Sequence, residues 1–110
     1  MAVTLTVDAS GRICQWSHEA EQMLGHSEAD AMGQSIEMII PPHLRGRHNA
    51  GFARYVKTGV SHLPEVATSL AVHSSGEMFK VDISLVPVYG DNHTIIAVQA
   101  MMQRSGQNRA

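Results

Sequence analysis

The sequence predicts one long helix, in the middle of the chain, and its apolar face constrains everything around it. Leu44, His48, Phe52 and Tyr55 stand at i, i+4, i+8 and i+11, which places them on one face of an α-helix. The other positions carry mostly arginine, lysine and asparagine, so this face must point toward the interior. A pair of prolines suits its first turn and Gly59 suits its end. The histidine at its centre is either a core residue bonded to a neighbouring group or a ligand.

Strand patterns flank this helix on both sides. Short, β-branched or alternating segments predict five strands, at residues 3–7, 12–16, 66–72, 78–88 and 94–102. Two short helices are expected, at residues 17–25 and 27–33. This order predicts an α+β fold, a five-stranded antiparallel sheet with the helices grouped on one face. The last strand is largely apolar, so we expect it to be central and covered on both faces.

Composition sets further bounds. A chain of 110 residues forms one domain, and a formal net charge of −2 gives no electrostatic case for a nucleic acid or membrane partner. No stretch is long and apolar enough for a membrane span. A single cysteine, Cys14, suits a reducing compartment, so we expect a cytoplasmic protein. We expect Cys14 to be a buried structural thiol, on the strand face that also carries Trp16 and opposite Ile13.

Four segments stand in an order and spacing that match a known family: DASGRICQW at 8–16, SHEAEQMLGHS at 17–27, MGQSIEMIIPPHLRGRH at 32–48 and HSSGEMFKVDISLVPV at 73–88. Together they resemble a PAS domain, over nearly the whole chain. The resemblance implies the PAS fold. It assigns residues 1–103 to a PAS sensor domain and 104–110 to a disordered tail or the start of a linker to an output module.

Within that family the motifs are most similar to the heme-PAS domains of oxygen-sensing histidine kinases. There, a histidine in an Arg-His…Arg-Tyr pattern on the long helix ligates the iron, and Arg47-His48 and Arg54-Tyr55 have that spacing here. The resemblance implies heme held through His48 as the metal ligand. Thr68 and Val66 stand where those sensors place an arginine and, in some relatives, a methionine beside the bound gas, so the usual polar clamp is missing.

The helix face and the resemblance together give a set of candidate cofactor-binding residues, which would line a pocket between the long helix and the sheet. The set is His48, Leu44, Phe52, Tyr55, Leu63, Val66, Thr68, Val81, Ile83 and Leu85. Met101 and Met102 point to opposite faces of the last strand, so one of them faces inward. That methionine is either a second iron ligand or core filler.

Two functions remain open. The first is a sensory domain that binds heme or another small molecule and relays its state to an output module, such as a histidine kinase, a cyclic-dinucleotide enzyme or a transcription regulator. The second is a cofactor-free PAS module for dimerisation or for docking of a partner protein through its exposed sheet face. A homodimer through PAS–PAS contacts is expected in the first case as well. The sequence contains no nucleophile elbow or phosphate-binding glycine loop, so we expect no catalytic site in this chain.

Overall fold

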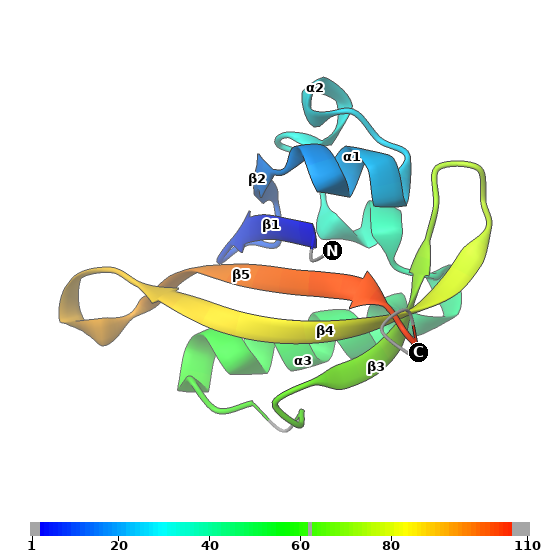
Figure 1. Cartoon of the computed structure of the whole chain (residues 1–110). Helices are drawn as coiled ribbons and strands as arrows, with labels where there is room; N and C mark the ends of the chain where they lie inside the picture. The colour runs from blue at the N-terminus through cyan, green and yellow to red at the C-terminus, as the bar shows by residue number, and fades with distance from the viewer. Residues whose placement is uncertain (1–2, 62, 107–110) are drawn as a thin grey trace.

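The computed structural model of the chain describes residues 3–61 and 63–106 (Figure 1). The strands are β1 (Val3–Asp8), β2 (Ile13–Trp16), β3 (Ala67–Val72), β4 (Met78–Tyr89) and β5 (Ile95–Arg104). The helices are α1 (His18–Leu24), α2 (Glu28–Ala31) and α3 (Arg45–Thr58), with 3-10 turns η1 (Ile36–Ile39), η2 (Pro42–Leu44) and η3 (Asp91–His93). None of the described helices is long and apolar enough to cross a membrane.

The strands form one antiparallel sheet in the order β2-β1-β5-β4-β3. The helices lie on one face, called the inner face below, and leave the other, outer face open (Figure 1). The predicted α+β class, the five antiparallel strands and the one-sided helices are therefore confirmed. The first and last strands of the chain pair with each other, so β5 is the central strand, as predicted.

The turn between β1 and β2 is built around Asp8, whose Oδ1 accepts hydrogen bonds from the N–H groups of Ser10, at 2.9 Å, and Arg12, at 3.0 Å. The Ser10 hydroxyl donates to the same oxygen. These bonds, that of the Ser10 hydroxyl first, lower the pKa of Asp8. Gly11 follows at φ +87°, a conformation that favours glycine. The two strands expected at residues 3–7 and 12–16 are thus joined by a tight turn.

The helix ends also follow the sequence. The Ser17 side chain accepts a hydrogen bond from the Ala20 N–H and caps α1, and Gly25 ends it at φ 80°. The proline pair introduces η2, which leads directly into α3. Gly59, at φ 73°, ends α3 and donates its N–H to the Tyr55 carbonyl.

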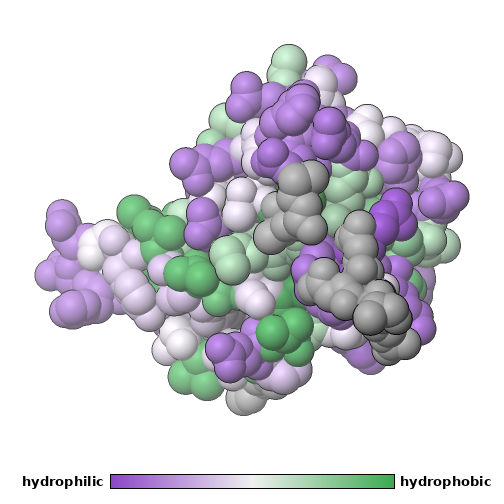
Figure 2. Space-filling view, viewed as in Figure 1, coloured by the Kyte–Doolittle hydropathy of each residue, from purple (hydrophilic) through white to green (hydrophobic). Residues whose placement is uncertain are grey.

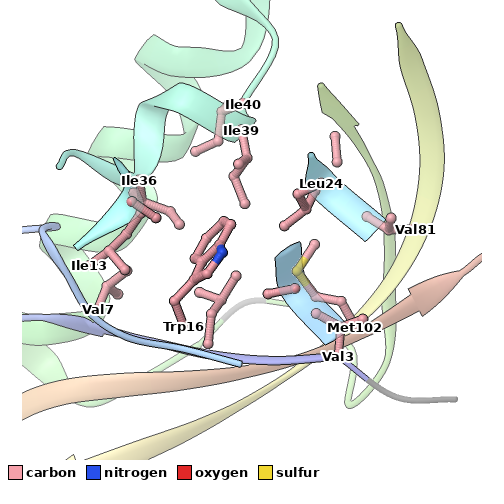
Figure 3. Close-up of a cluster of buried hydrophobic side chains, with 14 of the residues drawn as sticks. Val3, Val7, Ile13, Trp16, Leu24, Ile36, Ile39, Ile40, Val81 and Met102 are labelled. Atoms are coloured by element: carbon pink, nitrogen blue, oxygen red, sulfur yellow. The ribbon is translucent and has the colours of Figure 1, made fainter. Parts of the chain in front are cut away.

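The main core lies between the inner face and α1, α2 and η1 (Figure 3). Trp16 is buried there, and its Nε1–H donates to the His26 carbonyl at 2.9 Å. Ile13 is buried as well, so the prediction that Ile13 and Trp16 lie on opposite strand faces is wrong. The pairing between β1 and β2 shifts by one residue between Thr6 and Val7, and this bulge turns both side chains inward.

The same bulge leaves Cys14 exposed, so the predicted buried thiol is wrong. Its Sγ lies 3.5 Å from the Thr6 carbonyl oxygen. Burial of part of the side chain, followed by the charge of Asp8, raises the pKa of the Cys14 thiol. A thiol with a raised pKa is a poor nucleophile at neutral pH.

The prediction that β5 is covered on both faces is also wrong. Val98 and Met102 are buried on the inner face, whereas Ile96 and Met101 on this strand are 51% and 41% exposed. The reason is that every described helix lies on the inner face (Figure 1). The adjacent pair Met101 and Met102 divides between outside and inside, as its alternation predicted.

The strand also runs two residues further than predicted, to Arg104. The guanidinium carbon of Arg104 lies 4.1 Å from the centre of the Phe79 ring, a cation–π contact. The Ser105 N–H donates to the Lys80 carbonyl at 3.0 Å. The C-terminal end of β5 is thereby attached to the beginning of β4. Residues 107–110 of the expected tail lie outside the described residues.

Candidate functional site

The long helix α3 packs loosely on the inner face. Leu44, Phe52, Tyr55 and Val56 contact the core cluster, and the predicted inward face is thus the face that packs. None of the described residues of α3 is fully buried, however. The side chains of this face are only half-buried. A helix that covers a completed core buries its central apolar residues, so α3 is packed less completely than α1, which buries Ala20 and Leu24.

His48 lies at the middle of this face and is half-buried. Its ring lies nearly parallel to the Phe52 ring, with 6.0 Å between the ring centroids and 14° between the planes. Its Nδ1 is 3.3 Å from Oδ1 of Asn49, and Nδ2 of Asn49 donates to Oε1 of Glu37 at 2.7 Å.

This short chain of hydrogen bonds favours one tautomer of the imidazole. The Asn49 amide nitrogen is the donor to Glu37, so the Asn49 oxygen is the acceptor toward His48. Nδ1 of a neutral His48 must then carry the hydrogen, and Nε2 carries the lone pair. Among the described residues nothing donates to that Nε2. A neutral imidazole with a free Nε2 is the form in which histidine ligates a metal.

The opposite wall is the inner face of β4, where burial decreases along the strand. Val81 is fully buried, Ile83 is half-buried and Leu85 is 36% exposed. These residues share one face because strand side chains alternate. Exposure of an inward leucine shows that protein atoms do not fill the space beside it. We call the surface formed by His48, Phe52, Tyr55, Ile83 and Leu85 the open trough.

Val81 was predicted to line the pocket, but it lies in the filled core beside Leu24 and Met102 (Figure 3). Leu44, at the first turn of α3, packs against that core and borders the trough.

The three candidates from the segment after α3 are all exposed. Leu63 and Val66 are 57% and 55% exposed in the connection to β3, which begins at Ala67 and not at Val66. Thr68 points to the outer face, where its hydroxyl donates to Oδ1 of Asp82 at 2.8 Å. Ala67 pairs with Ile83 and shares its inward face, so the next residue must point outward. The prediction that Thr68 faces the pocket is therefore wrong.

Tyr55 marks the end of the trough nearest the C-terminus of α3. Burial raises the pKa of its hydroxyl, and the neighbouring Tyr89 raises it further. The predicted strand ended at residue 88, but β4 includes Tyr89 as its last residue, after a register shift that follows Val88. Asn49 and Glu37 were also missed, because their bonds to each other and to His48 join η1 to α3 and have no sequence pattern.

The chemistry of the trough suits a cofactor that needs a single protein ligand. No group of three or more His, Cys, Asp or Glu side chains that could hold a metal ion occurs in residues 3–61 and 63–106. A bare zinc ion takes three or four protein ligands. Heme brings four nitrogens of its own and needs one axial ligand and a flat apolar surface. His48 Nε2 and the aliphatic side chains of Ile83 and Leu85 are groups of that kind, so the types of residue present are compatible with heme.

A hollow lies beside β1 and β2 and extends to Glu28 and Met32 at the two ends of α2. It is an open groove of about 360 Å³ whose lining includes Thr4, Thr6, Cys14, Gln15 and Gln99. The Thr6 hydroxyl donates to Oε1 of Gln15 at 2.6 Å within it. Leu5, Trp16 and Met32 also line this groove, so its surface is mixed polar and apolar.

The relatives found by comparison with other sequences include two bacterial proteins. An uncharacterised protein of Azorhizobium caulinodans is 30% identical over 83 residues, which are 74% of this chain and 11% of that protein. The sensor protein FixL of Bradyrhizobium diazoefficiens is 34% identical over 59 residues, which are 54% of this chain and 12% of that protein. The matched part thus spans about a tenth of the length of each relative.

Solved structures share the fold. The PAS domain of a protein from Colwellia psychrerythraea has a TM-score of 0.78 at 20% identity and covers 94% of this chain and 85% of its own. The PAS domain of the Cronobacter turicensis quorum-sensing receptor RpfR, in complex with C12:0, has a TM-score of 0.77 at 14% identity, covering 94% and 93%. At these identities the likeness concerns the fold alone.

A family model described as PAS domain matches residues 1–103, nearly the whole chain. The sheet order, the one-sided helices and the trough under α3 have been described above on independent grounds. PAS domains act in signalling proteins as sensory modules that typically bind a ligand. This chain belongs to the PAS domain family.

Proposed function

We propose that this PAS domain senses a small, largely apolar molecule bound in the open trough, with heme ligated by His48 as the first candidate. The observation that carries the proposal is the free Nε2 of His48 on the face of α3 that packs toward the unfilled apolar wall of β4. The similarity to FixL and the Arg-His…Arg-Tyr spacing support heme over other ligands. Bound heme supplies an iron that takes a diatomic gas on its free side.

The signal would travel as a shift between two packings of α3. Because α3 has no fully buried residue, a ligand in the trough changes its packing at small cost to the main core. The neighbouring end of β5 is held by Arg104 on Phe79 and by the Ser105–Lys80 hydrogen bond. An output module, such as a histidine kinase, a cyclic-dinucleotide enzyme or a transcription regulator, would follow that end in a cytoplasmic signalling protein, with 104–110 as a tail or linker.

The test is titration of the purified chain with hemin, followed by the Soret absorption band. We expect binding in the wild type, and loss or a shift of the band in His48→Ala. His43→Ala is the matched control, since His43 is exposed on the preceding turn and should leave the band unchanged. An unchanged band in His48→Ala contradicts the ligand assignment, and the absence of any band contradicts heme.

If heme does not bind, the same trough suits an acyl chain, because its wall is aliphatic and aromatic. The RpfR PAS domain in complex with C12:0 supports this choice of probe. We then expect dodecanoate to raise the thermal unfolding temperature of the wild type and to lose that effect in Leu85→Asp.

A cofactor-free docking module is the second candidate, and the outer face supports it. Four apolar side chains on β4 and β5 are well exposed there: Val86, Val88, Ile96 and Met101. Figure 2 shows hydrophobic patches over the region where Figure 1 places these two strands. Exposed apolar residues gathered on one face are typical of protein interfaces.

A further inference from the structure

The charged residues of the chain are divided between two segments in a way that neither the trough nor the sheet explains. Residues 17–37, which include α1 and α2, hold five acidic residues and no lysine or arginine. Residues 42–59, which include α3, hold four lysine and arginine residues and no acidic residue. The formal net charge of −2 therefore contains one strongly cationic helix.

Three of these cations lie on the side of α3 that faces away from the core. Arg47 and Arg54 are two helical turns apart and Lys57 follows one turn later, so the three share one stripe. All three are exposed. Within the part of the chain that the structure describes, none of their side chains forms an ion pair or a hydrogen bond, and the one ion pair found there belongs to α1. The three charges are thus available to a partner.

The helix surface between these cations is bare. Ala50 and Gly51 lie on the same stripe and are exposed, and a Cβ at Gly51 would meet nothing within 4 Å. Packing inside the chain therefore does not require glycine here, although glycine destabilises the interior of a helix. A surface without protruding side chains lets another backbone come close. We call the surface formed by Arg47, Ala50, Gly51, Arg54 and Lys57 the cationic face.

We propose that the cationic face binds an acidic helix of a partner protein. Arg47 and Arg54 are about 10.5 Å apart along the axis, which is the spacing of acidic side chains at i and i+7 on a second helix. Side chains on one face of an extended strand are about 6.7 or 13 Å apart and do not match. In an antiparallel arrangement, acidic residues at i, i+3 and i+10 lie opposite Lys57, Arg54 and Arg47.

Acidic residues beside α3 oppose a wider polyanion. Glu37 accepts a hydrogen bond from Asn49 of α3 at 2.7 Å, and Glu65 is exposed in the connection that follows the helix. A nucleic-acid duplex or an anionic membrane presents negative charge over a surface much broader than one helix, and would bring it against these carboxylates. An acidic helix is narrow enough to contact α3 alone, so charge complementarity favours it.

The test is an NMR titration of the whole nitrogen-15-labelled chain with an alanine-based helical peptide. The probe carries glutamate at i, i+3 and i+10, and the control peptide has the same composition with its glutamates on different sides of the helix. We expect the probe to shift the amide signals of residues 45–58, less so at high salt, and the control to bind about tenfold more weakly. Absence of shifts, equal binding of the two peptides, or stronger shifts with a short DNA duplex overturns the proposal.

Matched variants separate direct pairing from a general effect of charge. Arg54→Glu should weaken binding of the probe about tenfold, and a probe with lysine at i+3 should recover it. Lys80→Glu makes the same change in net charge at an exposed position of β4 and should leave the affinity unchanged. Circular dichroism checks that both variants fold. Equal weakening by the two substitutions, or no recovery with the lysine probe, contradicts the pairing.

Gly51→Leu tests the close approach of the two helices. Leucine favours a helix and the space at Gly51 is open, so the thermal unfolding temperature should not fall, whereas the probe should bind several-fold more weakly. Unchanged binding contradicts the contact. None of these measurements requires a ligand in the open trough, so their outcome is separate from that of the hemin titration.

Discussion

The half of the molecule around Trp16 and the half around His48 are built from the same sheet but packed differently. In the first, α1 and η1 bury residues such as Leu24 and Ile39 almost completely. In the second, α3 contributes no fully buried residue, and Leu85 on the facing strand remains 36% exposed. A domain that must keep its shape while one wall moves needs such a division. Under the proposed function, the filled half would hold the sheet while the open half responds to the ligand.

The difference in packing between the two halves is tested most strongly by truncating one large apolar side chain in each of them to alanine. Leu24→Ala removes a fully buried side chain and should lower the free energy of unfolding by about 3 kcal/mol. Phe52→Ala removes a larger but half-buried side chain and should cost only about 1 kcal/mol, while weakening ligand binding. Urea denaturation measures both. A cost for Phe52→Ala equal to that of Leu24→Ala would show that the trough is a filled core.

A substitution at Gly25 tests how tightly the β3–β4 hairpin packs against the end of α1. A Cβ at Gly25 would collide with the His73 and Ser74 side chains, and the residue has φ +80°. The Ser74 N–H also donates to the Leu24 carbonyl at 2.9 Å. Gly25→Ala should therefore cost about 2 kcal/mol or more.

Gly33→Ala is the matched control, because Gly33 has φ +82° and nothing within 4 Å of the new atom. It should cost about 1 kcal/mol, from the backbone conformation alone. Equal thermal destabilisation by the two substitutions would mean that the hairpin moves away freely and that the filled half ends before it.

A substitution at Asp8 tests how much the hydrogen bonds of the β1–β2 turn contribute to the stability of the filled half. Asp8→Ala should cost about 1 kcal/mol at neutral pH, since Oδ1 holds three hydrogen bonds. Folding lowers the pKa of Asp8, so its contribution is present above the ordinary value of 3.8 and is lost as the pH falls through the folded pKa. The difference from wild type in urea denaturation should narrow toward acid pH. Asp91→Ala in the other hairpin, whose side chain makes no described bond, should show neither effect.

The smallest change in the free energy of unfolding is expected for a substitution at Asn49, in the open half. Asn49→Ala should change the stability by less than about 0.5 kcal/mol, because the residue is exposed. It should, however, remove the preference for hydrogen on Nδ1 of His48. Nitrogen-15 chemical shifts of the imidazole report the tautomer directly, without any ligand. A wild-type ring already protonated on Nε2 would contradict the argument for a free lone pair.

The sequence predicted most of the filled half, since local signals determine it. Ser17 and Gly25 end α1 as their chemistry requires, and alternation placed Phe79 and Val81 inside. It failed at Cys14, because a bulge shifts the pairing by one residue without any turn signal. In the open half it found the correct helix face. It could not place Thr68, because the face of a strand depends on its register with β4.

Trp16 has a consequence for experiments on this domain. It is the only tryptophan of the chain, and it lies in the filled half with its indole N–H held by the His26 carbonyl. Both tyrosines, Tyr55 and Tyr89, belong to the other half. Each half therefore contains a different intrinsic fluorophore. Tryptophan emission therefore reports on the filled half alone in the unlabelled protein. The tyrosines of the open half pass excitation energy to Trp16 in so small a domain, so a change in that transfer reports on the distance between the two halves.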